Sequence, residues 1–563
     1  MRRMLTLTLA LSFLFANAQE RYNGQELLLM QQYEGARQYF QQQLKQNAEN
    51  EEAWLGLTRA MIAQSNPEKA LEELNKAPEK TQESHLFRIA KAGALLALNR
   101  NAEADVLFQY SIDNTKSKNA EVLKSIARWH VELDNVDASA ALPLLENAAR
   151  RAKKDAEIYY LEGKAYRKLH KGTEAYQAFQ EALDRDGDFA AAYYELGRIF
   201  QTQKNADVYT DYFTRAIKAE PGFAPALYEM YEHHLYQSPE KAREYFLAYR
   251  QQADPDIQQE YEYTDLLYLN KNYDSAVLAA KQIIDKEAGK AKARLYKLMA
   301  YSLQELNDTA KAIAFMKQYF QREVDSNLIA KDFETMGQLY SSSFGQLDSA
   351  IHYYALAVEK TEVKEQRLNY FRQLAALGKQ SGNPATEAKW LGRYYLADPD
   401  ASNVTLFNWG LAAYKAEDFV QADSVFAMYA SKYPEQGYGY YWRARANAAI
   451  DTSMEAGLAV PHYQQLAGML NKTPDSLSTS DKKWLVEANM YLASYATNTQ
   501  KDYPAAVEYF KKVVELDPDN TTAPQYIEIL EKTIQASAAA GSKSESGQTE
   551  EEEKGESSSV PER

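Results

Sequence analysis

The residues that could bind a metal or catalyse a reaction are few and scattered in this sequence. It has no cysteine and seven histidines, of which only His233 and His234 are adjacent. Adjacent residues of a helix point in different directions, so these two cannot hold one metal ion together. The acidic run 184–188, DRDGD, has the composition of a calcium loop, but its glycine comes two positions too early for an EF-hand. We therefore expect no metal site and no cofactor.

Catalytic motifs are also missing. The sequence contains no GxxxxGK[ST] phosphate-binding loop, no GxSxG nucleophile elbow, no HExxH and no CxxC. Aspartate and glutamate are numerous, 79 in all, but no motif sets two of them apart as acid and base. The sequence gives no positive evidence for catalysis, and we predict that the protein is not an enzyme.

The most regular pattern is a stretch that occurs twice, at 156–189 and again at 190–223. Gly163 recurs as Gly197 and Phe179 as Phe213, each 34 residues later. Such a period indicates a repeat array in which a small residue on one helix allows a second helix to approach. The residues to which we assign this packing role are Gly163, Ala175, Phe179, Ala182, Gly197, Phe213, Ala216, Gly410, Ala422, Phe426, Ala506 and Phe510.

This period and these residues resemble the tetratricopeptide repeat (TPR) family, in which each repeat is a pair of antiparallel helices. The resemblance implies an all-α fold, a right-handed TPR solenoid of antiparallel helix pairs with about a dozen repeats over residues 19–535. Residues 434–483 break the period and form either a protruding loop or an elongated helix pair with a long connector. Residues 523–535 suit a capping helix, and the Ser-, Gly- and Glu-rich acidic tail 536–563 should be disordered.

The first residues, MRRMLTLTLALSFLFANAQE, have a basic start, an apolar core and a small-x-small site. They predict a cleaved secretory signal peptide at 1–18; the alternative is an uncleaved membrane anchor. The formal net charge of −15 disfavours nucleic acid and anionic membranes as partners, and favours a cationic partner segment. The overall layout resembles exported TPR proteins of Gram-negative bacteria, which implies a periplasmic location or one peripheral to the outer membrane, without direct membrane insertion.

The candidate binding residues lie on the first helix of successive repeats, which lines the concave groove in the family. A tyrosine recurs there at steps of 34 residues, and a charged residue follows it one turn later on the same face. These groove residues are Tyr160, Lys164, Tyr194, Arg198, Tyr228 and Glu232. Such a surface suits an extended peptide or a helix of a partner protein.

We therefore predict a non-catalytic scaffold for proteins of the cell envelope, accessory to outer-membrane transport, secretion or assembly. The alternative is a periplasmic chaperone or carrier that holds unfolded exported proteins. An enzyme that acts on cell-wall glycan is a weaker third reading. The identity of the partner and the oligomeric state stay open.

Overall fold

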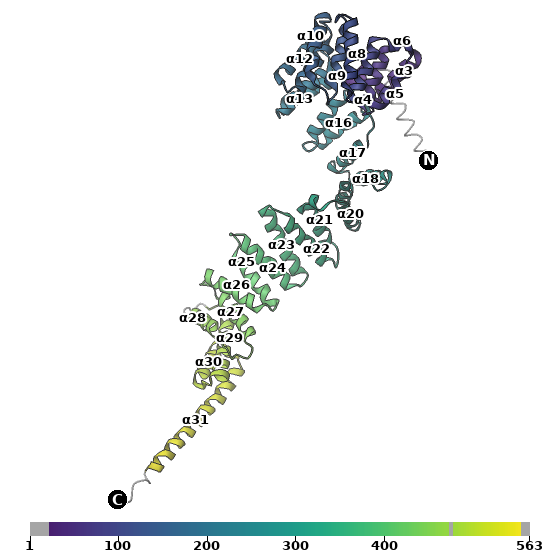
Figure 1. The fold of residues 1–563 in the computed structure, drawn as a ribbon. Helices are drawn as coiled ribbons and strands as arrows, with labels where there is room; N and C mark the ends of the chain where they lie inside the picture. The colour runs from purple at the N-terminus through teal and green to yellow at the C-terminus, as the bar shows by residue number, and fades with distance from the viewer. Residues whose placement is uncertain (1–21, 472–476, 553–563) are drawn as a thin grey trace, which may run out of the picture. The chain divides into compact units, whose positions relative to one another are not determined.

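The structure is a computed structural model that describes residues 22–471 and 477–552 (Figure 1). Over these residues it is built of helices joined by short turns, without β-strands, and consecutive helices pack against each other. The prediction of an all-α, TPR-like solenoid of helix pairs is therefore confirmed. The predicted signal peptide, 1–18, lies outside the described residues, as does the end of the tail, 553–563.

The chain divides after Leu306 into two compact units, which we call unit 1 and unit 2. The helices of unit 1 are α2 (Gly24–Leu29), α3 (Tyr33–Gln46), α4 (Glu51–Ala63), α5 (Pro67–Leu74), α6 (Glu79–Gln82), α7 (His85–Ala97), α8 (Asn101–Asn114), α9 (Ala120–Glu132), η1 (Ala138–Ala140), α10 (Ala141–Arg151), α11 (Ala156–Lys168), α12 (Gly172–Arg185), α13 (Ala190–Thr202), α14 (Ala206–Ala219), α15 (Ala224–His234), α16 (Pro239–Gln252), α17 (Ile257–Leu269), α18 (Tyr273–Glu287) and α19 (Ala293–Glu305).

Unit 2 continues the pattern of paired helices. Its helices are α20 (Thr309–Arg322), η2 (Asp325–Asn327), α21 (Ala330–Ser341), α22 (Leu347–Lys360), α23 (Lys364–Gln380), α24 (Pro384–Ala397), α25 (Asn403–Lys415), α26 (Phe419–Lys432), α27 (Gly437–Ile450), α28 (Val460–Leu470), α29 (Thr479–Tyr495), the π-helical turn η4 (Ala496–Gln500), α30 (Tyr503–Leu516) and α31 (Thr522–Glu552). None of the described helices has both the length and the apolar character that a bilayer crossing requires.

The two helices of a repeat meet where an aromatic ring covers a glycine. A Cβ atom on Gly163 of α11 would lie 2.5 Å from Cε1 of Phe179 on α12, and Gly197 stands in the same relation to Phe213. In unit 2, a Cβ on Gly410 would lie 2.7 Å from Cζ of Phe426. All the residues to which the sequence assigns a packing role are buried in the structure. The absence of a side chain at the glycine is thus what sets the close distance between the helices.

The turn between the two helices of a repeat is built the same way in successive repeats. His170 lies in the turn after α11 and Lys204 in the turn after α13, and both adopt the left-handed conformation, with φ of 60° and 57°. In the first of these turns Lys171 N donates to Tyr166 O at 2.9 Å, which satisfies a carbonyl at the helix end. The chain then reverses direction within three residues, so α12 packs back along α11.

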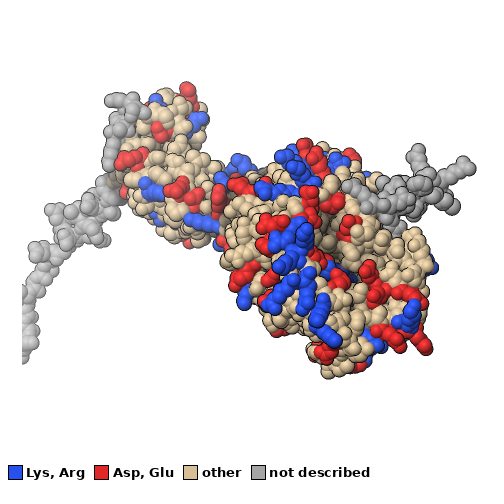
Figure 2. All heavy atoms as spheres, turned by 90° about the horizontal axis from the view of Figure 1, so that it is seen from above, with Lys and Arg blue, Asp and Glu red and all other residues tan. Residues whose placement is uncertain are grey.

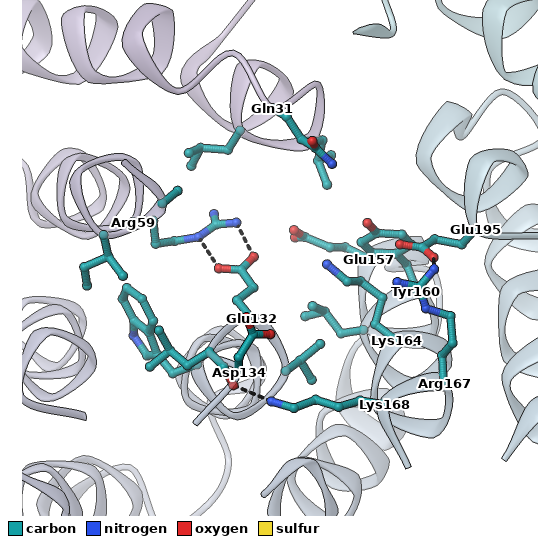
Figure 3. A pocket seen from close by; sticks show the side chains of 18 of the residues that line it. Gln31, Arg59, Glu132, Asp134, Glu157, Tyr160, Lys164, Arg167, Lys168 and Glu195 are labelled. Carbon is teal, nitrogen blue, oxygen red and sulfur yellow. Dashed lines mark hydrogen bonds and ion pairs between the residues drawn. The ribbon is translucent and has the colours of Figure 1, made fainter. Parts of the chain in front are cut away.

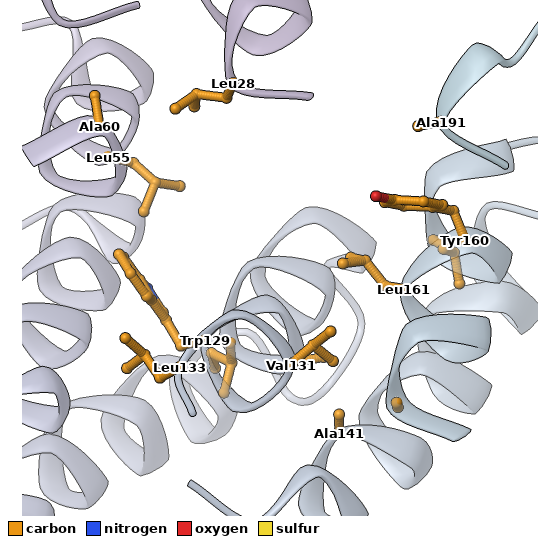
Figure 4. Packing of buried hydrophobic residues seen from close by; sticks show 14 of the residues in the cluster. Leu28, Leu55, Ala60, Trp129, Val131, Leu133, Ala141, Tyr160, Leu161 and Ala191 are labelled. Carbon is orange, nitrogen blue, oxygen red and sulfur yellow. The ribbon is translucent and has the colours of Figure 1, made fainter. Parts of the chain in front are cut away.

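The apolar core of unit 1 runs through its first helices without interruption. Figure 4 shows part of it, where Leu55 of α4, Trp129 of α9 and Leu161 of α11 point toward a common space. These three side chains are at most 4% exposed. The core therefore holds the first helices in a fixed curve around that space.

Residues 434–483 contain two helices, α27 and α28, and the start of α29. Gly437 and Gly439 lie inside α27 rather than in a protruding loop, and a Cβ on Gly439 would lie 2.7 Å from the backbone nitrogen of Ala430 on α26. Gly439 therefore serves the close packing of α27 on α26, whereas a Cβ on Gly437 would lie 3.1 Å from Met469 of α28 and from Trp484 of α29. The non-helical connector is 451–459, and residues 472–476 of the polar run lie outside the described residues.

The last helix, α31, is longer than the capping helix expected at 523–535 and continues to Glu552. The structure thus differs from the sequence-based expectation of disorder over 536–552. The alanines at 536 and 538–540 favour the first part of this continuation, since alanine has the highest intrinsic helix propensity, but the Gly- and Ser-containing stretch 541–552 has no such explanation.

Candidate functional site

A cavity of about 750 Å³ lies inside the curve of unit 1 (Figure 3). Side chains from α2, α4, α9, α11 and α13 line it, together with the turns that follow these helices. These are first helices of their repeats, which is the side that the resemblance assigns to the concave groove. The volume is within the range of sites that bind small molecules or short peptide segments.

The first helices of unit 1 complete the wall of this cavity because the array curves back on itself. Tyr22 Oη donates a hydrogen bond to Glu220 Oε1 at 2.5 Å, across 198 positions of sequence. The backbone N–H of Glu34 donates to Asp254 Oδ2 at 2.7 Å, across 220 positions. We call these contacts, between residues 22–34 and the turns at 220–222 and 252–254, the seam. The helices from α2 to α16 thereby form a closed ring around the cavity.

The carboxylates on the α9 side of the cavity are held by arginines. Arg59, whose side chain is 5% exposed, donates from Nε and Nη2 to the two oxygens of Glu132 at 3.2 and 2.7 Å. Its Nη1 donates to Gln25 Oε1 at 2.5 Å, which ties α2 to the same cluster. Burial raises the pKa of Glu132, but attraction to Arg59 and Arg128 outweighs it and leaves the pKa below its ordinary value.

Glu157 at the start of α11 is held in the same way. Arg128 Nη2 lies 2.5 Å from Glu157 Oε1, and Lys124 Nζ lies 3.2 Å from Oε2. Burial of this carboxyl acts to raise its pKa, but the two cations outweigh burial and lower the pKa to about 2. Glu132 and Glu157 are therefore ionised and already neutralised by side chains of the ring.

The cations on the α11 side differ in how far they are compensated. Arg167 forms an ion pair with Glu195, and Lys168 donates to the carbonyl oxygens of His130 and Leu133. Lys164 forms no ion pair with any residue in the described part of the chain, and its Nζ lies 5.6 Å from the ring centre of Tyr160. Its side chain extends into the cavity in Figure 3. The cavity thus contains the ammonium group of Lys164, which has no carboxylate at ion-pair distance among the described residues.

Three of the six groove residues that the sequence singles out line this cavity: Tyr160, Lys164 and Tyr194. The two tyrosines are mostly buried, at 7% and 9% exposure, because their rings pack against phenylalanines of their own repeats. These two tyrosines therefore support the wall of the cavity and present only a small part of their surface to a ligand, and the binding role predicted for them stays a prediction. Burial also raises the pKa of Tyr160 well above its usual value.

The other three groove residues are not part of the lining. Arg198 donates to Tyr194 Oη at 2.9 Å and to Glu229 Oε1 at 3.0 Å, and so joins α13 to α15. Tyr228 Oη donates to Glu262 Oε1 at 3.3 Å, and Glu232 is exposed. Arg198 and Tyr228 thus make contacts between successive repeats. A binding role for these three residues stays a prediction.

The residues that sequence reasoning missed include Arg59, Arg128 and Glu132, which are charged residues in or beside apolar stretches. Arg59 lies within the apolar run WLGLTRAMIA, and Arg128 and Glu132 lie in or next to the run VLKSIARWHV. A single charge inside a stretch that is otherwise buried needs a partner, because an unpaired buried charge is very costly. A charged residue within an apolar run therefore indicates a buried ion pair, but the sequence does not show which charges form the pair.

The histidine pair serves packing contacts. His233 Nδ1 lies 2.8 Å from Tyr209 Oη, and the ring of His234 stacks on Tyr245 with centroids 5.7 Å apart. A hollow of about 300 Å³ beside them is also lined by Asp207 and Asp211. Among the described residues, no group of three His, Cys, Asp or Glu side chains is arranged to hold a metal.

The charged side chains of the surface are mixed in sign. On the face seen in Figure 2, acidic and basic side chains lie among one another rather than in large separate fields. Mixed charge of this kind does not provide the basic surface that nucleic acid requires.

The sequence matches models of the tetratricopeptide repeat at four places, residues 27–92, 160–224, 405–435 and 489–520. The second match spans the cavity residues from Tyr160 to Phe223. The matches lie in both units and, with the helix pairing, support the tetratricopeptide repeat family for this chain. No curated protein matches it by sequence.

Several solved structures of TPR proteins are similar to this chain. The C-terminal part of a TPR repeat-containing protein from Cytophaga hutchinsonii is 28% identical over 47% of this chain and 99% of its own, with a TM-score of 0.28. YrrB, described as a TPR protein with an unusual peptide-binding site, is 19% identical over 34% of this chain and 96% of its own, with a TM-score of 0.23. The APC/C hetero-tetramer Cut9–Hcn1 is 14% identical over 93% of this chain and 99% of its own, with a TM-score of 0.21. Because these TM-scores are low, no property of these proteins is assigned to this chain.

Proposed function

We propose that this protein is a non-catalytic scaffold that binds other proteins, and that the cavity of unit 1 receives a segment of a partner. TPR proteins generally mediate protein–protein interactions, and their fold is generally non-catalytic. The observation that carries the proposal is the ammonium of Lys164, which extends into a cavity whose glutamates are already paired. A partner segment with an acidic side chain or a terminal carboxylate would neutralise the charge of Lys164.

We further propose that the protein acts in the cell envelope of a Gram-negative bacterium, as an accessory to outer-membrane transport, secretion or assembly. The support is the predicted signal peptide at 1–18 and the resemblance to exported TPR proteins. Secretion of a fusion of residues 1–18 to a reporter enzyme, compared with a fusion that starts at residue 19, tests this location. Equal retention of both reporters in the cytoplasm would contradict it.

The chaperone alternative requires a broad apolar surface that accepts many unfolded chains. The exposed large apolar residues of unit 1 are spread over three elements: Val106 and Tyr110 lie on α8, Tyr236 in the turn after α15 and Leu278 on α18. This distribution favours the scaffold. Suppression of the aggregation of several unrelated proteins by the purified chain would favour the chaperone instead.

Site-specific photocrosslinking in intact cells tests the cavity directly. A photoreactive benzoylphenylalanine replaces Ala63, which lines the cavity, and in a control chain it replaces Lys218, which is exposed on α14 and is not part of the lining. We expect a small set of partner adducts at position 63, few at position 218, and a loss of most adducts when Lys164→Gln is added. Equal adducts at both positions, or adducts that do not respond to Lys164→Gln, would refute the cavity as the site.

A further inference from the structure

The joint at the seam differs in chemistry from the joints within the ring. Within the ring, helices meet through buried aromatic rings that cover glycines, such as Phe40 on Gly56 and Trp129 on Gly93. The seam contains two hydrogen bonds between distant parts of the chain, from the hydroxyl of Tyr22 to Glu220 and from the backbone of α3 to the carboxylate of Asp254, beside buried apolar side chains such as Met30. Apolar burial provides most of the stabilisation of packed helices, whereas a hydrogen bond contributes about 0.5–1.5 kcal/mol net.

When the seam opens, neither of its two carboxylates is left without a favourable interaction: Glu220 keeps a hydrogen bond within the chain, and Asp254 becomes hydrated. Glu220 Oε1 accepts a second hydrogen bond, from Gly222 N at 3.0 Å, so this carboxylate keeps a partner without Tyr22. Burial, the largest influence, raises the pKa of Asp254, which means that the closed seam disfavours the ionised form of this side chain. Opening returns Asp254 to water and leaves only the first N–H groups of α3 to be hydrated.

Helix α3, which Asp254 contacts, has no N-terminal capping side chain of its own. Gln32, the residue before α3, makes no capping hydrogen bond with its side chain, so Asp254 supplies the cap from the far side of the ring. One apolar contact accompanies these groups, since a Cβ on Gly222 would lie 3.0 Å from Cε of Met30. The seam is thus a small joint between parts of the chain that are distant in sequence.

We propose that unit 1 is a clamp that opens and closes at the seam. The superhelix flexes so that residues 22–34 separate from the turns at 220–222 and 252–254, while the aromatic–glycine joints stay packed. The role of this motion rests on the proposed function. Opening would let an internal segment of a partner protein enter the cavity from the side, and closing would encircle that segment. A closed ring alone would admit only a chain end.

Spin labels test the opening without any ligand. Because the chain has no cysteine, a label pair can be placed cleanly by Gln42→Cys on α3 and Gln251→Cys on α16, two exposed positions on either side of the seam. The control pair is Gln177→Cys on α12 and Asp211→Cys on α14, which are exposed and equivalent positions 34 residues apart. Distance distributions are measured by pulsed electron paramagnetic resonance, in the parent and after Tyr22→Phe with Asp254→Ala.

We expect the seam pair to gain a population at longer distance, increased about tenfold or more by the double substitution, and the control pair to keep one unchanged distance. Amide hydrogen exchange gives a second readout: the first turn of α3 should exchange about tenfold faster in the double variant, and α11 should not change. Circular dichroism confirms that each variant is folded.

An unchanged distribution for the seam pair in a folded double variant would overturn the proposal. Equal broadening of both pairs would also overturn it, because the whole array would then be loosened rather than the seam. An opening seam together with negative photocrosslinking at position 63 would reject the binding function but not the clamp.

Discussion

Phe179 covers Gly163 so closely that a Cβ atom at position 163 would lie 2.5 Å from its Cε1 atom and 2.6 Å from Cδ1. The ring belongs to the second helix of the repeat and is fully buried, so it has no room to move aside. The same relation recurs between Gly197 and Phe213. The distance between the two helices of a repeat therefore depends on the absence of one methyl group.

Gly163→Ala should destabilise unit 1, although alanine is the better helix former, because the added methyl overlaps the Phe179 ring. Overpacking of this kind typically costs about 1–3 kcal/mol. Urea unfolding followed by circular dichroism measures the loss. The matched control is Gly172→Ala at the start of α12, where an added Cβ meets no atom within 4 Å. The control should be neutral or stabilise by up to about 1 kcal/mol, and equal losses in both variants would contradict the close approach.

The stability of unit 1 should depend on acid through Glu157. Its pKa is lowered from 4.5 to about 2 by Arg128 and Lys124, so its contribution is fully present above pH 4.5 and is lost as the pH falls toward 2. The shift corresponds to a contribution on the order of 3 kcal/mol at neutral pH. Thermal unfolding of the parent and of Glu157→Gln should differ most near pH 7 and converge near pH 2. A gap that stays constant over this range would argue against the ionised carboxylate as the cause.

Removal of Arg59 should be among the more damaging charge substitutions. Arg59→Ala removes the bidentate partner of Glu132, which is 28% exposed and keeps Arg128 at 3.9 Å, so we expect a loss of about 1.5–3 kcal/mol, the contribution of hydrogen bonds to charged groups. Arg100→Ala is the control, since this arginine pairs with Glu103 at an exposed position and should contribute less than about 1 kcal/mol. The two melting temperatures decide the matter, and comparable decreases would mean that the Arg59–Glu132 pair is not a structural element of the wall.

Lys164→Gln should leave the fold nearly unchanged, because the ammonium has no ion pair among the described residues and its loss breaks none. We expect a change in unfolding free energy within about 0.5 kcal/mol. Glu195→Gln, on a side chain that is 5% exposed and paired with Arg167, should be clearly more destabilising. Differential scanning calorimetry of the two variants compares them, and a large loss in Lys164→Gln would point to a structural role for this lysine.

Much of the fold could be predicted from the sequence because each repeat is a local structure. The 34-residue period places Gly163 against Phe179 and gives paired helices, since these contacts join residues close in sequence. The same reasoning left residues 434–483 open between a protruding loop and a helix pair, because glycines such as Gly437 and Gly439 suit a loop as well as a close contact with a neighbouring helix. Local pattern alone does not separate these two uses.

The candidate site could be predicted only in part. Periodicity identified Tyr160, Lys164 and Tyr194 as facing the concave side, but it could not show that the two tyrosines are largely covered. The ring was beyond such reasoning, because its closure depends on small rotations between repeats that accumulate over the 198 residues from Tyr22 to Glu220. The charge pairs of the cavity depend in turn on that curvature.

The closed seam also changes how unit 1 can unfold. In an open solenoid each repeat contacts only its neighbours, so a terminal repeat frays at the cost of a single interface. The contact from Tyr22 to Glu220 gives the first repeat of unit 1 a second interface and raises the mean sequence separation of contacts in this unit. While the seam is closed, the loss of the first described repeat of unit 1 is therefore coupled to the sixth and seventh. This linkage makes unfolding more cooperative than a linear array allows, and it makes closure a late event in folding, after the intervening repeats have formed.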